Sequence, residues 1–235
     1  MTLNKNTKMF LSYVLPSMIG MLIVGSYSIV DTVFIGQSAG ELGLASVAVT
    51  WPLVMLFGAV GDLLGTGAAV IISQSRGSGS LDRARRIFGN MLECQLIFSL
   101  LMMAAMLYYL EPALILFGAK PELMPGAVAY SKILIYGNLA CMLQMAVTAV
   151  IRNDGRPMLS MWLTISGLLI NIILDYYFIF PLKGGIVGAA YATVIAQGLI
   201  ALAGLTYFAT QYTNLRYNGK MFKLVPANVK KIIIS

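Results

Sequence analysis

The sequence lacks histidine, has only two cysteines and is poor in charge: Asp, Glu, Lys and Arg together make up 11% of its 235 residues. Soluble domains carry about 25% charged residues. Hydrophobic residues reach 59%, so a soluble fold of this length would expose too much apolar surface. These shortages exclude an ordinary soluble domain and indicate a membrane protein. Cys94 and Cys141 both fall in apolar stretches, so we expect no structural disulfide.

Long apolar runs are what the sequence has instead. Six stretches reach the roughly 20 residues that a helix needs to cross a bilayer, and we expect an all-α, polytopic bundle of six transmembrane helices. The first stretch is too long for a signal peptide and no small-residue cleavage site follows it, which indicates a retained helix. The stretches are Met9–Ile35, Ser46–Ser73, Ile87–Leu110, Ala127–Ile151, Leu159–Phe180 and Ile186–Thr210.

The formal net charge of +7 is explained by orientation in a membrane. In the six-helix arrangement 13 of the 16 basic residues lie on one side, and only Lys120, Lys132 and Lys183 lie on the other. The positive-inside rule makes the richer side cytoplasmic, so both termini are expected in the cytoplasm and the chain in the plasma membrane. The expected partner of the basic residues is the lipid bilayer and not nucleic acid. Leu81–Arg86 is expected to be a short amphipathic segment on the cytoplasmic surface.

Three lone carboxylates, Asp31, Asp62 and Asp175, stand inside apolar stretches that contain no Lys, Arg or His. An acidic residue within a transmembrane helix costs several kcal/mol, and such residues usually mark ion or substrate pathways. Nothing in these stretches can pair with the carboxylates permanently. A cation from solution, either a proton or a metal ion, is therefore their natural partner.

Asn171 and Asp175 are four residues apart, so they share one helix face at a separation of about 6 Å. Thr193 and Gln197 have the same spacing in the sixth stretch. Carboxylate, amide and hydroxyl oxygens are hard ligands that suit a proton or Na⁺. If Asp31 meets Asp175 across the bundle, repulsion between the two carboxylates favours protonation of at least one, and the pair titrates as a unit.

Each of these residues also has a structural interpretation. Asn171 can form a hydrogen bond between helices, and Asp31 and Asp175 can do the same while protonated. Asp62 follows Gly61 in a Gly-rich stretch, where a functional role and the mere lining of a wet cavity are equally open. Pro16 removes a backbone hydrogen bond and predicts either a hinge or a static kink in the first helix.

The end of the sequence differs in composition from the rest. After Gln211 the chain becomes polar and basic, and another apolar run begins at Ile232. We expect residues 1–212 to form the six-helix lobe, and residues 213–235 to form a basic cytoplasmic linker with the start of a further helix. The pattern at residues 231–235 repeats that at residues 8–12, which fits the start of a second six-helix lobe in a longer protein.

Four segments resemble the N-terminal lobe of the multidrug and toxic compound extrusion (MATE) family, and their order and spacing cover almost the whole chain. Asp62 matches nothing in the family pattern. The family has twelve helices in two lobes, so the resemblance implies that this chain is one lobe of a two-lobe transporter. The segments are Leu15-Pro16 with Ile29–Gly36, Gly65–Ala69 with Ile72–Gln74, Arg152 with Gly155 and Pro157, and Asn171–Asp175 with Gly185–Thr193.

The resemblance implies a transporter and not an enzyme. Family members export organic cations in exchange for H⁺ or Na⁺, so the implied partners are small organic cations and the C-terminal lobe of the same protein. The resemblance implies no cofactor, and H⁺ or Na⁺ serves as the coupling ion. The residues that match the cation site of the family, where Na⁺ would bind, are Asp31, Asn171, Asp175 and Thr193. Pro16 matches the proposed hinge, and Tyr130 matches a tyrosine near that site. Gln197 and Asp62 are supporting candidates from their own positions in the sequence and not from the resemblance.

Three other functions were weighed. A lipid-linked oligosaccharide flippase of the same superfamily is expected to carry basic residues in its cavity for pyrophosphate, whereas those of this chain are assigned to the helix ends. An intramembrane aspartyl protease is disfavoured because Asp175-Tyr176 reverses the Tyr-Asp order, and Ala59 takes the place of the first glycine in Gly-x-Gly-Asp. A structural membrane subunit without transport activity stays open.

Overall fold

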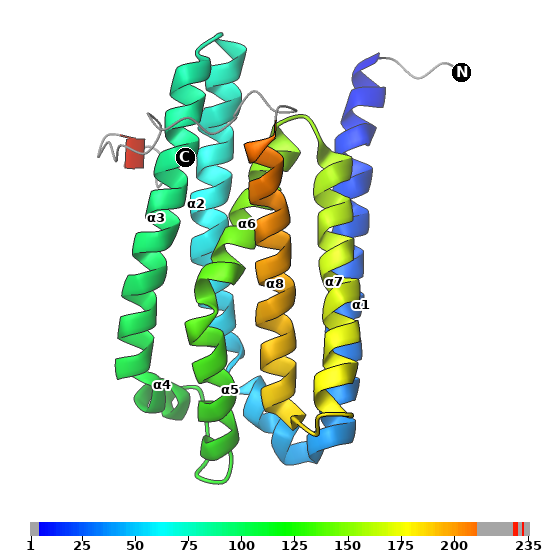
Figure 1. The fold of residues 1–235 in the computed structure, drawn as a ribbon, viewed down its shortest axis with the longest axis vertical. Coiled ribbons are helices and arrows are strands. Elements are labelled where there is room, and N and C mark those ends of the chain that lie inside the picture. Colours follow the sequence, from blue (N-terminus) through cyan, green and yellow to red (C-terminus); the bar gives the residue numbers. More distant parts are fainter. Residues whose placement is uncertain (1–4, 211–227, 230–231, 233–235) are drawn as a thin grey trace.

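The computed structural model describes residues 5–210, 228–229 and 232, and this part of the chain consists of helices, turns and bends. The long helices stand side by side as a bundle (Figure 1). In chain order the helices are α1 (Lys5–Ala48), α2 (Trp51–Gly77), α3 (Leu81–Tyr108), α4 (Leu110–Leu116), α5 (Met124–Tyr136), α6 (Asn138–Asn153), α7 (Pro157–Ile179) and α8 (Gly185–Ala209). The prediction of an all-α bundle is confirmed.

Five of the six predicted spans match apolar helical segments of the right length. Helices α2, α3, α7 and α8 are each long and apolar enough to cross a membrane, and α5 with α6 makes a fifth span if the pair is taken together. The remaining predicted span, Met9–Ile35, falls within α1. Many side chains in its first half lie outside the described residues, so its role as a sixth span stays a prediction.

The predicted fourth span, Ala127–Ile151, is not one straight helix. It is broken between Tyr136 and Asn138, and α5 and α6 meet at an angle of 52°. The break is held by two buried contacts. The Asn138 side chain accepts a hydrogen bond from the Ser99 hydroxyl and donates one of 3.0 Å to the Ser99 carbonyl. A Cβ at Gly137 would lie 2.4 Å from the Val194 side chain of α8, so this position has no room for a larger residue.

Two segments expected outside the helices are helical. After Ile35 the chain stays helical as far as Ala48, but a kink at Gly40 (φ 63°, ψ −161°) divides α1 into two helical segments. The last part of α1 is tied to the start of α5, because the Ser46 hydroxyl donates a 3.3 Å hydrogen bond to the Leu123 carbonyl. Leu81–Arg86 is not a separate surface segment but the beginning of α3.

The core is built by close contact between α2 and α6. A Cβ at Gly61 would lie 2.7 Å from the Met142 Cα, and a Cβ at Gly65 would lie 2.5 Å from the Ala146 Cα. Small residues at such positions let helix backbones approach one another within a membrane. Both cysteines are buried and unpaired. Side chains of α2, α3 and α6 fill the space around this contact, among them Phe88, which packs against Phe208 of α8.

The turns sort into two ends of the bundle. The start of α1, the turn between α2 and α3 and the turn between α6 and α7 lie at the upper end in Figure 1, whereas α4 and the turn between α7 and α8 lie at the lower end. Arg76, Arg83 and Arg86 flank the first of these upper turns, and Arg152 and Arg156 flank the second. The predicted clustering of basic residues at one end is therefore seen for these five. Which end faces the cytoplasm stays a prediction.

Most of the expected linker, residues 213–235, lies outside the described residues. Three of its positions are described, and they contact the lobe. The Asn228 amide donates a 3.0 Å hydrogen bond to the Asn90 side chain of α3. Ile232 is fully buried, and a Cβ at Gly67 of α2 would lie 2.0 Å from its carbonyl oxygen.

Candidate functional site

Helix α7 buries several polar side chains and exposes many of its large apolar ones. It begins at Pro157, two residues after Gly155, whose φ of 87° is a turn conformation that suits glycine. Its buried residues recur with helical spacing and include Asn171, which is 4% exposed, and Asp175, which is 1% exposed. Large apolar residues such as Ile173 stand on the exposed side. This reversed pattern is typical of a helix that faces lipid outward and a polar site inward.

Asp31 lies on α1, which packs along α7 (Figure 1). The side chain is half-buried, and it is close enough to Asp175 for the two charges to interact. The sequence left open whether the two aspartates approach each other, and in this structure they are near enough for their charges to interact. Asp31 is more exposed than Asp175, which is 1% exposed.

Tyr130 of α5 is the third member of this cluster. It is 6% exposed, and its hydroxyl interacts electrostatically with both Asp31 and Asp175. A phenol can donate a hydrogen bond to a carboxylate and can accept one from a protonated carboxyl. Tyr130 is thus able to serve both protonation states of its neighbours. From the sequence alone this residue was only a supporting candidate.

The polar atoms of the cluster are buried without hydrogen-bond partners in the described structure. They are Oδ1 of Asp31, both carboxylate oxygens of Asp175 and Nδ2 of Asn171. An ionised carboxylate in such a place is costly unless it is neutralised. No Lys or Arg forms an ion pair with either aspartate in the described part of the chain, where the ion pairs are Arg76–Asp154 and Arg85–Asp82. The cluster is therefore suited to take up a proton or a small cation.

Thr193 and Gln197 lie on α8, the neighbour of α7, and both are half-buried. The two helices come very close near Gly188, where a Cβ would lie 2.8 Å from the Phe178 carbonyl oxygen. Ala189, one turn before Thr193, packs in the same apolar cluster as Tyr130. Thr193 therefore lies on the helix that packs against α7, one turn after a residue of the Tyr130 cluster. Its function as a cation ligand stays a prediction.

An apolar layer covers one end of the cluster, and sequence patterns did not reveal it. Ile35 and Ile179 each follow one of the two aspartates by one helical turn, and both are buried. Next to them, the rings of Phe34 and Phe180 meet edge to face at 5.7 Å. These residues belong to the same apolar cluster as Tyr130, so the layer packs against the site. In the sequence, the apolar layer is indicated only by the large apolar residue that follows each aspartate by one helical turn.

Two predicted residues lie apart from the cluster. Asp62 is exposed on α2, where it accepts a 3.1 Å hydrogen bond from the Thr66 hydroxyl. Pro16 lies in α1, but its side chain is outside the described part of the chain, so the hinge stays a prediction.

Lys132, assigned to a helix end from the sequence, lies within α5 and is exposed. No group of three or more Cys, Asp or Glu side chains arranged for a metal ion is found among the described residues.

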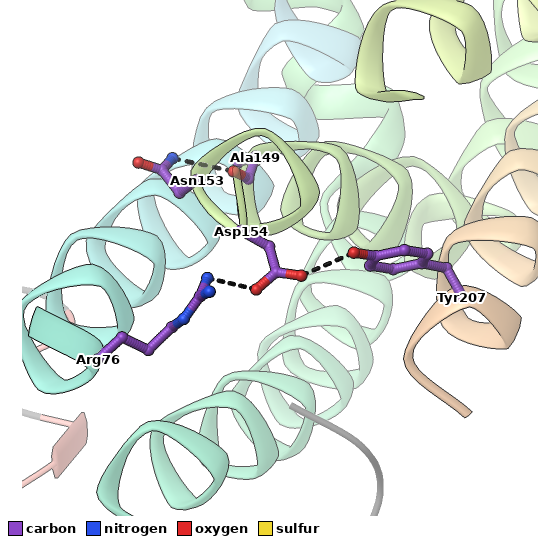
Figure 2. A network of polar contacts seen from close by, with 5 residues as sticks. All are labelled: Arg76, Ala149, Asn153, Asp154 and Tyr207. Atoms are coloured by element: carbon purple, nitrogen blue, oxygen red, sulfur yellow. Dashed lines mark hydrogen bonds and ion pairs between the residues drawn. The ribbon is translucent and has the colours of Figure 1, made fainter. Parts of the chain in front are cut away.

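A second polar network lies at the upper end of the bundle (Figure 2). Asp154, in the turn between α6 and α7, pairs with Arg76 of α2 and accepts a hydrogen bond from Tyr207 of α8. The Arg156 guanidinium lies 5.8 Å from the centre of the Tyr207 ring. Nothing in the residues of this turn predicts that Asp154 joins three segments of the bundle.

Comparison with known proteins agrees with this architecture. The family model MatE matches residues 16–177. The multidrug export protein MepA of Staphylococcus haemolyticus (strain JCSC1435) is 27% identical over 225 residues, which are 96% of this chain and 50% of that protein. The chain thus spans about half the length of the curated relatives that it matches.

Solved structures show the same relationship. One described as protein A has a TM-score of 0.91 at 31% identity and covers 99% of this chain and 52% of its own. A multidrug resistance MATE family transporter of the MOP superfamily, solved in an outward-facing conformation, has a TM-score of 0.89 at 26% identity, with 96% of this chain and 50% of that chain covered. The structural match reproduces one lobe of a two-lobe fold. The chain is a multi-pass membrane protein, and it belongs to the MatE family.

Proposed function

We propose that this chain is one lobe of a cation-coupled antiporter that exports organic cations and related xenobiotics in exchange for H⁺ or Na⁺. The observation that carries the proposal is the buried cluster of Asp31, Asp175 and Tyr130, in which neither aspartate has a basic partner among the described residues. The export function printed for the MepA relatives supports it. The lobe would be completed by a second lobe in the same membrane protein, because the matched relatives are about twice as long.

The cluster gives the exchange a physical basis. Loading a cation neutralises the repulsion between Asp31 and Asp175 and favours close packing of α1 against α7. Unloading restores the repulsion and favours their separation. If the drug binds better to one of these two arrangements, cation and drug disfavour each other by the same coupling free energy. The driving cation, entering from outside, would thereby release the drug that was bound from the cytoplasm.

The two possible coupling ions, H⁺ and Na⁺, would need different sets of ligands. Protons need only the carboxylates, whereas Na⁺ needs several oxygen ligands. Asn171, one turn before Asp175, and Thr193 on the neighbouring helix would supply the additional oxygens, with Gln197 in support. Na⁺ coupling would therefore depend on Asn171 and Thr193 more strongly than H⁺ coupling does.

The test uses the intact two-lobe transporter in proteoliposomes loaded with a fluorescent organic cation, with transport driven separately by a pH gradient and by a Na⁺ gradient. Asp31→Asn and Asp175→Asn are expected to abolish transport under both gradients. Asn171→Ala and Thr193→Ala are expected to reduce Na⁺-driven transport more than H⁺-driven transport. Asp82→Asn is the control, because the Asp82 side chain is 89% exposed near the start of α3. Full activity of both aspartate variants under both gradients would reject the proposal.

A further inference from the structure

Helix α2 has two opposite faces. One face packs into the lobe through Gly61 and Gly65, which lie against the α6 backbone, and it is reinforced by a 3.0 Å hydrogen bond from the Gln95 side chain to the Gly61 carbonyl. Leu64, Ala68 and the other buried residues of α2 extend this face along the helix. The contact with α6 and α3 fixes the rotation of α2 about its own axis.

The other face of α2 is exposed and carries Asp62 and Thr66 near its middle. Met55, Ala59, Asp62 and Thr66 follow one another at intervals of four, three and four residues, and all are exposed. At 100° per residue they form one stripe, which lies opposite the buried face. Asp62 and Thr66 are joined by a 3.1 Å hydrogen bond, so the hydroxyl orients one carboxylate oxygen.

The exposed face of α3 shows what a lipid-facing surface looks like in this lobe. At the corresponding depth it consists of Leu96, Ile97, Leu100 and Leu101, all apolar and each exposed by 44% or more. A charged side chain on such a face costs about 3 kcal/mol at the centre of a membrane helix. The stripe with Asp62 and Thr66 therefore does not have the composition of a surface that contacts lipid.

Asp62 also lies at the depth where transporters bind their substrates. It is the twelfth residue of α2, so it stands about 17 Å from the start of a helix that crosses a core of about 30 Å. Binding sites of two-lobe transporters lie near the bilayer midplane, at the interface between the repeats. Depth, polarity and exposure thus agree on one location for this stripe, the space between this lobe and the second.

We propose that the α2 stripe lines the drug cavity and that Asp62, oriented by Thr66, binds the positive charge of the transported organic cation. This inference rests on the proposed function and adds a substrate residue to it. Met55 offers a flexible apolar surface that adapts to different ring systems, and the next residue after Asp62, Leu63, is also exposed. Drug and driving cation then use different carboxylates, Asp62 on α2 for the drug and the Asp31–Asp175 pair on α1 and α7 for the ion.

Binding of ethidium, a permanent cation, to the purified intact transporter tests the assignment at fixed pH and without any gradient. Asp62→Asn is expected to weaken ethidium binding at least tenfold and to leave binding of a neutral hydrophobic dye unchanged. Asp62→Glu, which keeps the charge, is expected to bind within threefold of the unaltered protein. Asp82→Asn is the matched control for removal of an exposed carboxylate. Unchanged ethidium affinity in Asp62→Asn, or an equal loss for both dyes, would overturn the assignment.

Accessibility gives an independent readout. In a background with Cys94→Ala and Cys141→Ala, a cysteine at position 62 is expected to react with a cationic, water-soluble methanethiosulfonate reagent, and ethidium should slow the reaction. A cysteine at position 101 should not react. Absence of reaction at position 62 would show that α2 faces lipid or pairs with the second lobe, which would reject the inference.

The two proposals fail in different ways. If the unaltered transporter binds ethidium and Asp62→Asn binds it equally well, only the assignment of Asp62 is wrong. If Asp31→Asn and Asp175→Asn retain gradient-driven transport, the coupling proposal is wrong whatever Asp62 does. If the unaltered transporter binds no organic cation, both are wrong.

Discussion

The Tyr207 hydroxyl, near the end of α8, donates a 2.7 Å hydrogen bond to Oδ2 of Asp154 in the turn between α6 and α7. The other oxygen of the same carboxylate accepts from Arg76, near the end of α2. One nearly buried carboxylate therefore ties three chain segments together at the upper end of the bundle (Figure 2). Because this network joins α2 and α8 to the turn before α7, substitutions in it test how the ends of these helices are held together.

Removing the positive partner of Asp154 should destabilise the protein. In Arg76→Gln a carboxylate whose side chain is 4% exposed is left without its ion pair, and we expect the free energy of unfolding in detergent to fall by about 2 kcal/mol. Asp82→Asn disrupts the exposed pair with Arg85 and should change it by less than about 0.5 kcal/mol. Equal effects of the two substitutions would show that the network adds nothing to stability.

Adding a single methyl group where α2 contacts α6 should lower the free energy of unfolding. In Gly65→Ala the added Cβ would lie 2.5 Å from the Ala146 Cα, so we expect a loss of about 2 kcal/mol as the helices separate. Gly58→Ala, on the same helix, is the control, because nothing lies within 4 Å of its Cβ. Chemical unfolding in detergent should show Gly58→Ala at or slightly above the stability of the unaltered protein. Similar losses at both positions would contradict the close approach.

The break between α5 and α6 should depend on the Asn138 side chain. Asn138→Ala removes both contacts with Ser99 and leaves the buried Ser99 hydroxyl without its acceptor, so we expect a loss of about 2 kcal/mol. Asn153→Ala is the control: its amide bonds only the Ala149 carbonyl of its own helix, and the residue is exposed. Thermal unfolding in detergent should separate the two variants clearly. A stable Asn138→Ala protein would place the cause of the bend elsewhere, at Gly137 and Val194.

The orientation predicted from the basic residues can be tested on intact cells. Ser80 lies between α2 and α3, and Glu122 lies between α4 and α5, at opposite ends of the bundle (Figure 1). With the buried Cys94 and Cys141 replaced by alanine, a cysteine at position 122 should react with an impermeant thiol reagent. A cysteine at position 80 should react only after the cells are broken. The reverse pattern would invert the topology.

Much of the fold was predictable because the spans are long and their polar exceptions are few. The predicted end of the fifth span lies within one residue of the end of α7, and Asn171 and Asp175 are on the buried face that their spacing indicates. The break at Gly137 was not predictable from local composition, because both sides of it are apolar and its causes, Ser99 and Val194, come from other helices. The helical segment that follows Ile35 was also not predicted, because it lies beyond the kink at Gly40 and not in line with the first part of α1.

The same limit applies to the candidate site. Spacing predicted that Asn171 and Asp175 share a face, but it could not show that Tyr130 lies near enough to both aspartates to interact electrostatically. For Asp62 the sequence left the functional and the structural interpretation equally open. Its exposure on the face opposite Gly61 and Gly65 is a tertiary fact, and it sets Asp62 apart from the Asp31–Asp175 pair.

Gly61 and Asp62 are consecutive residues, and this restricts the motions open to α2. Rotation about the helix axis would drive the Asp62 carboxylate into the α6 backbone or withdraw Gly61 from Met142, and both changes are sterically or electrostatically expensive. Helices α2 and α6 therefore have few independent degrees of freedom and should travel as one rigid unit. Any change in access to the face of Asp62 must then come from displacement of whole helix pairs, with the bend between α5 and α6 as the place where the rest of the lobe can yield.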